Sequence, residues 1–208
     1  MARALGADPP VLLMDEPFGA IDPITRDRLQ GEFLRLQAEV GKTVVFVTHD
    51  IDEAVRLGDR IAVLREGGVL EQHASPAEVL GRPASPFVAG FVGADRGLKR
   101  LSVIPIDPES LEAPVTVAPG MPAPAAGGAS AAVVDGDGRL LGALAPGDDR
   151  MSPAVTVGAG ASLKDVTSAL LLSESGWVAV VEGDRLLGVL TPESVYAAAR
   201  RATLPNHG

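Results

Sequence analysis

Residues 11–17, Val-Leu-Leu-Met-Asp-Glu-Pro, are the stretch that decides the fold of the first half of the chain. Four successive apolar residues predict a short β-strand, buried on both faces if its sheet is parallel. Asp15 and Glu16 follow at its C-terminal end, where open α/β sheets bind their ligands. At this edge Asp15 is placed to hold Mg²⁺ through water, and Glu16 is placed to polarise an attacking water.

A second apolar strand, predicted at Thr43–Val47, brings His49 to the same edge of the sheet. Two carboxylates and an imidazole on parallel strands indicate part of a nucleotide hydrolase. The matching phosphate loop, G-x-x-x-x-G-K-[ST], does not occur in the sequence. We therefore interpret the first part of the chain as the downstream half of a nucleotide-binding domain, with a second domain attached.

Strands and helices alternate through the first hundred residues. Asp22 is a predicted N-cap, Pro23 fits the first helical position, and Gly41 ends that helix. The pattern predicts one apolar helix face, formed by Leu29, Phe33, Leu36 and Val40. A helix from Asp50 to about Leu57, a hairpin of Ile61–Leu64 with Val69–Gln72, and a helix capped by Ser75 with Glu78 complete the half-domain.

An internal repeat occupies the second half of the chain. Residues 132–144 reappear as residues 179–190, and residues 115–117 match residues 155–157. Each copy predicts a strand, a helix, a strand, an acidic glycine turn and a strand. The second copy has a predicted helix at Leu163–Leu172, whereas the first has only a Pro- and Gly-rich segment, too short for a full helix, in that place.

Composition excludes several classes of function. The net charge is −9 and no Lys/Arg stripe is present, so nucleic acid is not an expected partner. No apolar run reaches the roughly 18–20 residues that span a bilayer, and we expect no signal peptide. The chain has no cysteine, which agrees with a reducing cytoplasm.

Residues 1–93 resemble the C-terminal half of an ABC-type ATPase subunit. The resemblance makes Val11–Glu16 a Walker B motif, in which Asp15 is the Mg²⁺ residue and Glu16 is the catalytic base. It makes Gly19–Asp22 the D-loop that faces a partner ATPase, with Asp22 in the nucleotide-binding set. His49 occupies the switch position, which implies contact with the γ-phosphate of ATP. The Walker A loop, the Q-loop and the signature sequence are absent.

The closer resemblance is to the ATP-binding subunits of importers for glycine betaine, choline or carnitine. It rests on His49–Ala54, Leu57–Leu64, Pro86–Val88 and Phe91–Arg96. The repeat resembles a pair of cystathionine-β-synthase-type (CBS) regulatory domains. The resemblance implies a homodimer of ATPase subunits, a membrane permease, an extracytoplasmic substrate-binding protein, and a cytoplasmic position on the inner face of the membrane. The chain alone is expected to be inactive because ATP and Mg²⁺ need the missing half.

The predicted fold class is therefore α/β. A partial parallel sheet of the P-loop NTPase type with helices is followed by an α+β tandem CBS-type domain whose first copy is degenerate. The predicted domains are residues 1–93 for the ATPase half, 94–102 for a linker, 103–150 for the degenerate copy, 151–201 for the second copy and 202–208 for a tail.

The tail departs from the nucleotide-binding pattern of the CBS family, in which a Thr is followed three positions later by Asp. Thr191 is followed by Ser194 at that position, and the first copy keeps Asp148 but has Ala145 in place of the Thr. Sensing of ionic strength is then the more attractive role for the tail. Trp177 is expected to serve core or dimer packing rather than a cage for a cationic ligand.

Two alternatives stay open. In the first alternative, the chain is a non-enzymatic regulatory or assembly module. This alternative ranks lower because a stand-alone regulator would be expected to lose a half-domain whose sheet edge and apolar faces are bare. In the second, it belongs to an ATPase subunit of an importer for another small solute.

Overall fold

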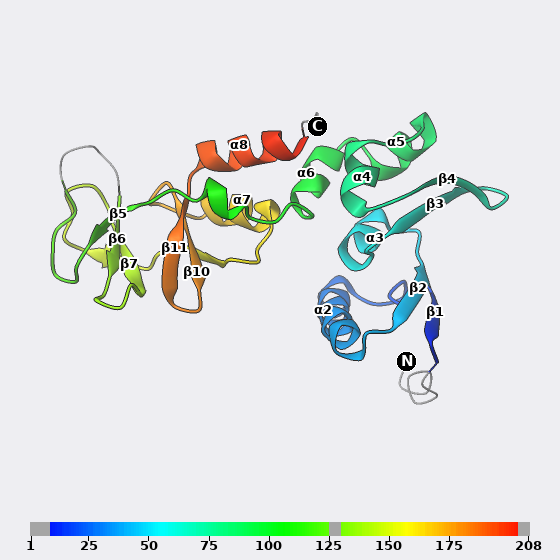
Figure 1. Cartoon of the computed structure of the whole chain (residues 1–208), viewed down its shortest axis with the longest axis horizontal. Coiled ribbons are helices and arrows are strands. Elements are labelled where there is room, and N and C mark those ends of the chain that lie inside the picture. The colour runs from blue at the N-terminus through cyan, green and yellow to red at the C-terminus, as the bar shows by residue number, and fades with distance from the viewer. Residues whose placement is uncertain (1–8, 125–129, 204–208) are drawn as a thin grey trace. The chain divides into compact units, whose positions relative to one another are not determined.

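The structure is a computed structural model that describes residues 9–124 and 130–203 (Figure 1). The chain divides into two compact units, residues 1–94 and 95–208. The first unit contains β1 (Val11–Asp15), α2 (Pro23–Val40), β2 (Thr43–Val47), α3 (Ile51–Leu57), β3 (Ile61–Arg65), β4 (Val69–Ala74), α4 (Pro76–Gly81) and α5 (Pro86–Val92). None of the helices in the described ranges is both long enough and apolar enough to cross a membrane.

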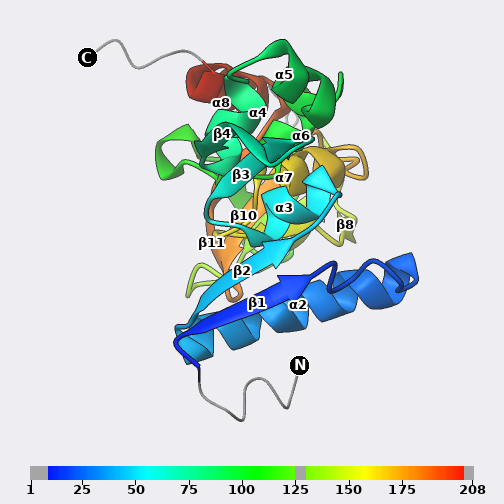
Figure 2. The same cartoon turned by 90° about the vertical axis from the view of Figure 1, so that its right-hand side faces the viewer.

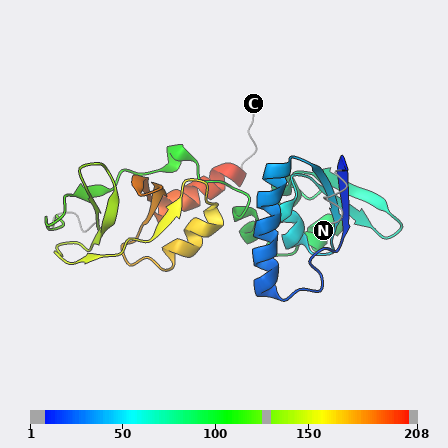
Figure 3. The ribbon, with the colours of Figure 1, turned by 90° about the horizontal axis from the view of Figure 1, so that it is seen from below.

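The predicted parallel pair of strands is confirmed. β1 and β2 pair in register from Val11 opposite Thr43 to Asp15 opposite Val47. The expectation that β1 is buried on both faces is wrong, because Leu12 is 7% exposed but Leu13 is 78% exposed. Helix α2 runs along only one face of the pair (Figures 2 and 3), so side chains that point to the opposite face stay open to solvent.

Helix α2 begins and ends where the sequence predicts. The Asp22 side chain accepts a hydrogen bond from the N–H of Thr25, and Gly41 ends the helix with a left-handed φ of 60°. The predicted apolar face is only partly buried: Phe33 is 6% exposed, whereas Leu29, Leu36 and Val40 are each 36–41% exposed. A sheet of two strands is too narrow to cover the whole stripe. The core that does form is centred on Phe33, Phe18 and Leu57.

The predicted hairpin and the capped helix follow in that order, and α5 is a further helix that the sequence analysis did not predict. β3 and β4 form an antiparallel hairpin, and Ser75 and Glu78 form a capping box at the start of α4. The side chains of Val79, Leu80, Val88 and Val92 are fully or almost fully buried. These residues come from α4 and α5, which contact β4 and give this end of the unit a core of its own.

The second unit contains the predicted repeat. Its elements are α6 (Arg96–Leu101), a 3₁₀ turn η1 (Pro108–Ser110), β5 (Val115–Val117), β6 (Ala131–Val134), β7 (Leu140–Leu144), β8 (Met151–Ser152), β9 (Thr156–Gly158), α7 (Leu163–Leu170), β10 (Val178–Glu182), β11 (Arg185–Leu190) and α8 (Pro192–Thr203). β5 is parallel to β6 and β6 antiparallel to β7, and β9, β10 and β11 repeat this pattern. Both copies have a register shift at the equivalent position, at 133/134 and at 180/181.

The two copies differ in their helices, as the sequence predicts. The second copy has α7, which begins with a capping box formed by Ser162 and Asp165. Within 118–124 and at 130 the first copy has no helix, and residues 125–129 lie outside the described ranges. The helix α6 lies within the segment 94–102 that we predict to be a linker.

Backbone hydrogen bonds join the two copies at their acidic turns. The N–H of Leu140 donates to the carbonyl of Asp184 at 2.9 Å, and the N–H of Leu186 donates to the carbonyl of Gly138 at 3.1 Å. Trp177 is 6% exposed and belongs to a cluster that includes Ala132 from the first copy. Its indole N–H donates to the carbonyl of Ser130 at 3.3 Å. The prediction that Trp177 packs in the core is confirmed.

Candidate functional site

Glu16 and His49 meet at the C-terminal edge of the parallel strands. Nδ1 of His49 lies 2.9 Å from Oε1 of Glu16. The side chain of His49 is 75% exposed and that of Glu16 is 53% exposed. The pairing of β1 with β2 causes this contact, because the N–H of Glu16 donates to the carbonyl of Val47 at 2.9 Å and so continues the ladder. The side chains that follow the two strands therefore arrive side by side.

The backbone of Glu16 is strained. Its φ is +41°, and no other non-glycine residue in the described ranges has a positive φ. Such a conformation costs on the order of 1–3 kcal/mol and is concentrated at functional sites. The turn is closed by the N–H of Gly19, which donates to the carbonyl of Glu16 at 3.2 Å. A Cβ at position 19 would lie 3.3 Å from Oε2 of Glu16, so glycine leaves room for that carboxylate.

Asp15 and Asp22 lie near this site in the sequence but have other surroundings. Asp15 ends β1 with an exposed side chain. Asp22 caps α2, and the hydrogen bond from the N–H of Thr25 lowers the pKa of its carboxyl. Neither carboxylate bonds to Glu16 or His49 in the part of the chain that the structure describes.

The residues present fit a magnesium ion that is held mainly by its nucleotide. Residues 9–124 and 130–203 contain no group of three or more His, Asp or Glu side chains that could form a metal cage. Mg²⁺ is usually bound by one or two carboxylates together with substrate phosphates and water. An exposed carboxylate at a strand end, such as that of Asp15, suits this mode of binding.

The structure adds a polar network that the sequence did not predict. The amide of Gln30 on α2 donates to the carboxylate of Glu53 on α3 at 3.1 Å, and these residues are 5% and 6% exposed. Arg56 donates to Gln30 at 3.0 Å and also bonds to Asp27. The network ties the helix after Asp22 to the helix after His49. A polar residue between Leu29 and Phe33 was the only sequence signal for it.

Thr191 and Asp148, the two residues of the CBS nucleotide-binding pattern that the repeat keeps, both form hydrogen bonds within the protein. Thr191 caps α8: its hydroxyl accepts the N–H of Ser194 at 3.2 Å and donates to the carboxylate of Glu112 at 2.7 Å. Asp148 accepts the N–H groups of Asp149 and Arg150 at 2.8 and 3.0 Å, and the bond from Arg150 lowers the pKa of its carboxyl. The hydroxyl that the second copy keeps and the carboxylate that the first copy keeps are therefore both hydrogen-bonded to groups of the chain itself.

The two units define an α/β protein: a two-stranded parallel sheet with helices is followed by an α+β unit in which two copies share one strand pattern. No protein-family model matches the sequence. The chain is 43% identical over 200 residues to the osmoprotectant import ATP-binding protein OsmV of Salmonella typhimurium, covering 88% of this chain and 52% of that protein.

Two further comparisons concern proteins named OpuCA. The chain is 51% identical over 116 residues to the glycine betaine/carnitine/choline transport ATP-binding protein OpuCA of Bacillus subtilis. The match covers 55% of this chain and 30% of that protein. A solved structure of Staphylococcus aureus OpuCA has a TM-score of 0.34 at 19% identity, over 45% of this chain and 96% of that one. By sequence, the chain is similar to ATP-binding proteins of osmoprotectant and glycine betaine, carnitine and choline transport. It spans about half the length of the Salmonella protein.

Proposed function

We propose that this chain provides the Walker B, D-loop and switch-histidine part of the ATPase subunit of an ABC importer for quaternary amines such as glycine betaine, choline or carnitine. The observation that carries the proposal is the Glu16–His49 contact at the C-terminal edge of two parallel strands. The names of the relatives, which include osmoprotectant import and glycine betaine, carnitine and choline transport, support the class of cargo.

Each of the four site residues has a proposed role. Glu16 polarises the attacking water, and general-base catalysis of this kind contributes about 10²–10⁴ in rate. His49, oriented by its 2.9 Å contact with Glu16, holds the γ-phosphate. Asp15 binds Mg²⁺ through water, and Asp22 faces the second ATPase subunit across a homodimer. When bound, ATP and Mg²⁺ supply the phosphoanhydride and the charge that stabilises its cleavage.

The chain alone is expected to be inactive, because no phosphate loop is present to position the nucleotide. The measurement is ATP turnover by the purified 208-residue chain. A rate above background that Glu16→Gln removes would contradict this part of the proposal.

The catalytic roles are tested in a chimera of the Salmonella protein in which residues 9–94 of this chain replace the matched segment. We expect ATP hydrolysis, and we expect Glu16→Gln to lower kcat by about 10²–10⁴. Glu66→Gln, at the exposed turn between β3 and β4, makes the same chemical change outside the site and should leave kcat unchanged. A Glu16→Gln chimera with parental kcat would overturn the role of Glu16.

The proposed assembly contains two copies of the ATPase subunit, a membrane permease and an extracytoplasmic substrate-binding protein. The ATPase subunit would lie in the cytoplasm, held on the inner face of the membrane by the permease. Residues 103–201 form the proposed regulatory tail, which responds to ionic strength because screening weakens exposed charge interactions. In the assembled transporter, ATPase activity should depend on salt, and deletion of the tail should remove that dependence.

The second candidate function is a non-enzymatic regulatory module. The self-contained second unit favours it, since Trp177 and the two acidic turns join both copies of the repeat into one core. The chimera separates the two functions: an inactive chimera, with an active Salmonella parent, would favour the regulatory module.

A further inference from the structure

Two polar links join α2 to α3, although the buried faces of helices are usually apolar. Gln30 of α2 donates to Glu53 of α3 at 3.1 Å, and these two residues are 5% and 6% exposed. Arg26, one turn before Gln30 on α2, has its guanidinium 3.9 Å from Oδ2 of Asp50, the residue that caps α3. We call these four residues, Arg26, Gln30, Asp50 and Glu53, the seam.

The burial of Glu53 costs free energy that an apolar pair would not cost. A carboxylate that leaves water loses its hydration, and a hydrogen bond to an amide replaces only part of it. Replacing a buried polar pair by apolar side chains of similar volume is often neutral or stabilising. Stability is therefore a poor explanation for the Gln30–Glu53 pair. A hydrogen bond differs from apolar contact in being directional, so the pair fixes how α3 lies against α2.

The seam continues by hydrogen bonds to the residues on both sides of His49. Oδ1 of Asp50 accepts the N–H of Glu53 at 3.3 Å, so the helix cap and the buried carboxylate are fixed to each other. The N–H of Asp50 donates to the hydroxyl of Thr48 at 3.0 Å. The placement of α3 therefore decides where the side chain of His49 lies.

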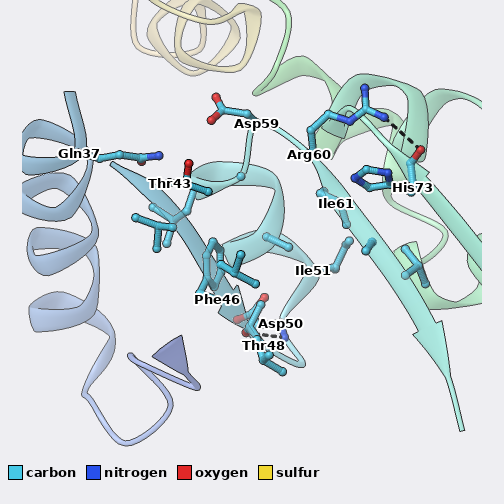
Figure 4. Close-up of a pocket in the computed structure, with 18 of the residues that line it drawn as sticks. Gln37, Thr43, Phe46, Thr48, Asp50, Ile51, Asp59, Arg60, Ile61 and His73 are labelled. Atoms are coloured by element: carbon cyan, nitrogen blue, oxygen red, sulfur yellow. Dashed lines mark hydrogen bonds between the residues drawn. The ribbon is translucent and has the colours of Figure 1, made fainter. Parts of the chain in front are cut away.

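On the side of β3, the same segment is not packed. Thr48 and Asp50 line a cavity of about 770 Å³ that lies between β2 and β3 (Figure 4). Packing from β3 therefore does not fix the segment, whereas the polar links of the seam tie it to α2.

The seam is also fixed to the Glu16 side of the site. The guanidinium of Arg26 donates to the carbonyl of Ile21 at 3.1 Å. Ile21 lies in the loop that runs from Glu16 to α2. Arg26 thus joins that loop to Asp50, the residue after His49.

We propose that the seam residues are positioning residues, which hold the ring of His49 against the carboxylate of Glu16. They act through the backbone on either side of His49 rather than on the substrate. The catalytic meaning of the seam rests on the proposed function, because it requires the proposed roles of Glu16 and His49. The effect of the seam on the ring of His49 does not depend on ATP hydrolysis.

The first test observes the ring of His49 in the full 208-residue chain. At about pH 8.5, where histidine is ordinarily neutral, long-range ¹H–¹⁵N correlation spectra show which ring nitrogen carries the proton. An ionised carboxylate only accepts hydrogen bonds, so the 2.9 Å contact with Glu16 places the proton on Nδ1 of His49. His73, exposed on β4, is an internal control in every spectrum.

A double substitution separates positioning from stability. Gln30→Leu/Glu53→Leu replaces both buried partners by apolar side chains, so it should unfold at a urea concentration at least as high as Glu53→Leu alone, which leaves the Gln30 amide without its acceptor. Because apolar contact lacks direction, the fraction of His49 protonated on Nδ1 should fall by about twofold or more in the double variant. Glu53→Gln keeps an oxygen that accepts from Gln30 and should keep the fraction of the parent chain.

Glu39→Leu is the matched control, because it removes a carboxylate from an exposed position of α2 outside the seam. It should leave the spectrum of His49 unchanged. A double variant with the Nδ1-protonated fraction of the parent chain would overturn the proposal. A loss in Glu53→Gln as large as that in the double variant would also overturn it, since the hydrogen bond would then not be what positions the ring.

The second test measures ATP hydrolysis in the chimera with the Salmonella protein. The double variant should lower kcat by about tenfold or more and change KM for ATP by less than about twofold, because a misplaced His49 affects the chemical step while the phosphate loop stays intact. An active parental chimera whose double variant keeps the parental kcat would overturn the catalytic meaning of the seam. An inactive parental chimera would refute the proposed function and that meaning with it, and the spectra of His49 would still decide whether the seam positions the ring.

Discussion

Glu16 has a chemical feature and a conformational one, and only the first could be read from the sequence. Its position after an apolar strand and beside Asp15 singled it out as a candidate base. Its φ of +41° and the 2.9 Å contact with His49 depend on how β1 and β2 pair. The strain is held by the ladder bond to Val47 on one side and by the turn to Gly19 on the other.

Two substitutions at position 16 should reveal this strain. Glu16→Gly and Glu16→Ala both remove the carboxylate, but only glycine adopts a positive φ without steric cost. The glycine variant should therefore be more stable than the alanine variant by about 1 kcal/mol. Urea unfolding of both variants measures the difference. A more stable alanine variant would show that the backbone at this position is relaxed.

The capping box at Ser75 predicts a dependence on pH. The backbone N–H and the hydroxyl of Ser75 both donate to the Glu78 carboxylate and lower its pKa from the ordinary value of 4.5. The backbone N–H has the larger effect. Because the pKa in the folded state is the lower one, the stabilisation is fully present above about pH 4.5 and is lost as the pH falls through the lowered pKa.

The measurement compares Glu78→Gln with the parent chain over a pH series. The parent should be more stable above pH 4.5, and the difference in free energy of unfolding should vanish on acidification. Glu66→Gln, on the exposed hairpin turn, controls for the loss of one negative charge. A difference that increases toward low pH would contradict the assigned sign.

At the scale of the element, local patterns predicted the starts and ends of helices and strands well. Asp22 and Ser75 cap helices as predicted, and Gly41 ends one in a left-handed conformation. Caps are local, so their residue types suffice to predict them. Which face of an element is buried is not local, and there the prediction for β1 was wrong and that for α2 only partly right.

Neighbouring leucines on β1 test the one-sided burial. Leu12→Ala should cost about 2 kcal/mol, the lower end of the usual range, because Leu12 is only 7% exposed but lines a small cavity together with Phe33 and Leu36 of α2. Leu13→Ala should change stability by less than about 0.5 kcal/mol, since Leu13 is 78% exposed. Chemical unfolding measures both values. Equal costs would show that the second face is covered in solution.

Gly142 is a close-approach position in the first copy of the repeat. A Cβ there would lie 2.6 Å from Cγ of Met151 and 2.6 Å from the carbonyl oxygen of Ser152. Gly142→Ala should therefore destabilise the second unit by about 1–3 kcal/mol, as overpacking does. Gly136→Ala, with nothing within 4 Å of the added carbon, is the matched control and should be near neutral. Similar unfolding midpoints for the two variants would refute the contact.

At the scale of the whole molecule, the two compact units have separate cores. The first is built around Phe18, Phe33 and Leu57, and the second includes Trp177, the only tryptophan in the chain. Trp177 packs against residues from both copies of the repeat. Its fluorescence therefore reports on the second unit as a whole.

This arrangement predicts separable unfolding. Gly142→Ala should shift the unfolding transition seen by Trp177 fluorescence, whereas Leu12→Ala should leave that transition in place and alter only the signal from circular dichroism. Denaturant unfolding followed by both probes measures this. A fluorescence transition that moves equally with Leu12→Ala would show that the units unfold together.

The sequence by itself determined most of the element order, the caps of the first unit, the repeat and the residues at the strand ends, because these depend on local chemistry and short-range periodicity. It also carried the resemblance that the relatives confirm. Only the tertiary structure decided which faces are covered, that Gln30 meets Glu53 across 23 positions, and that a cavity lies between β2 and β3. Burial, long-range pairing and a cavity depend on which segments meet in space, and a local pattern does not contain that information.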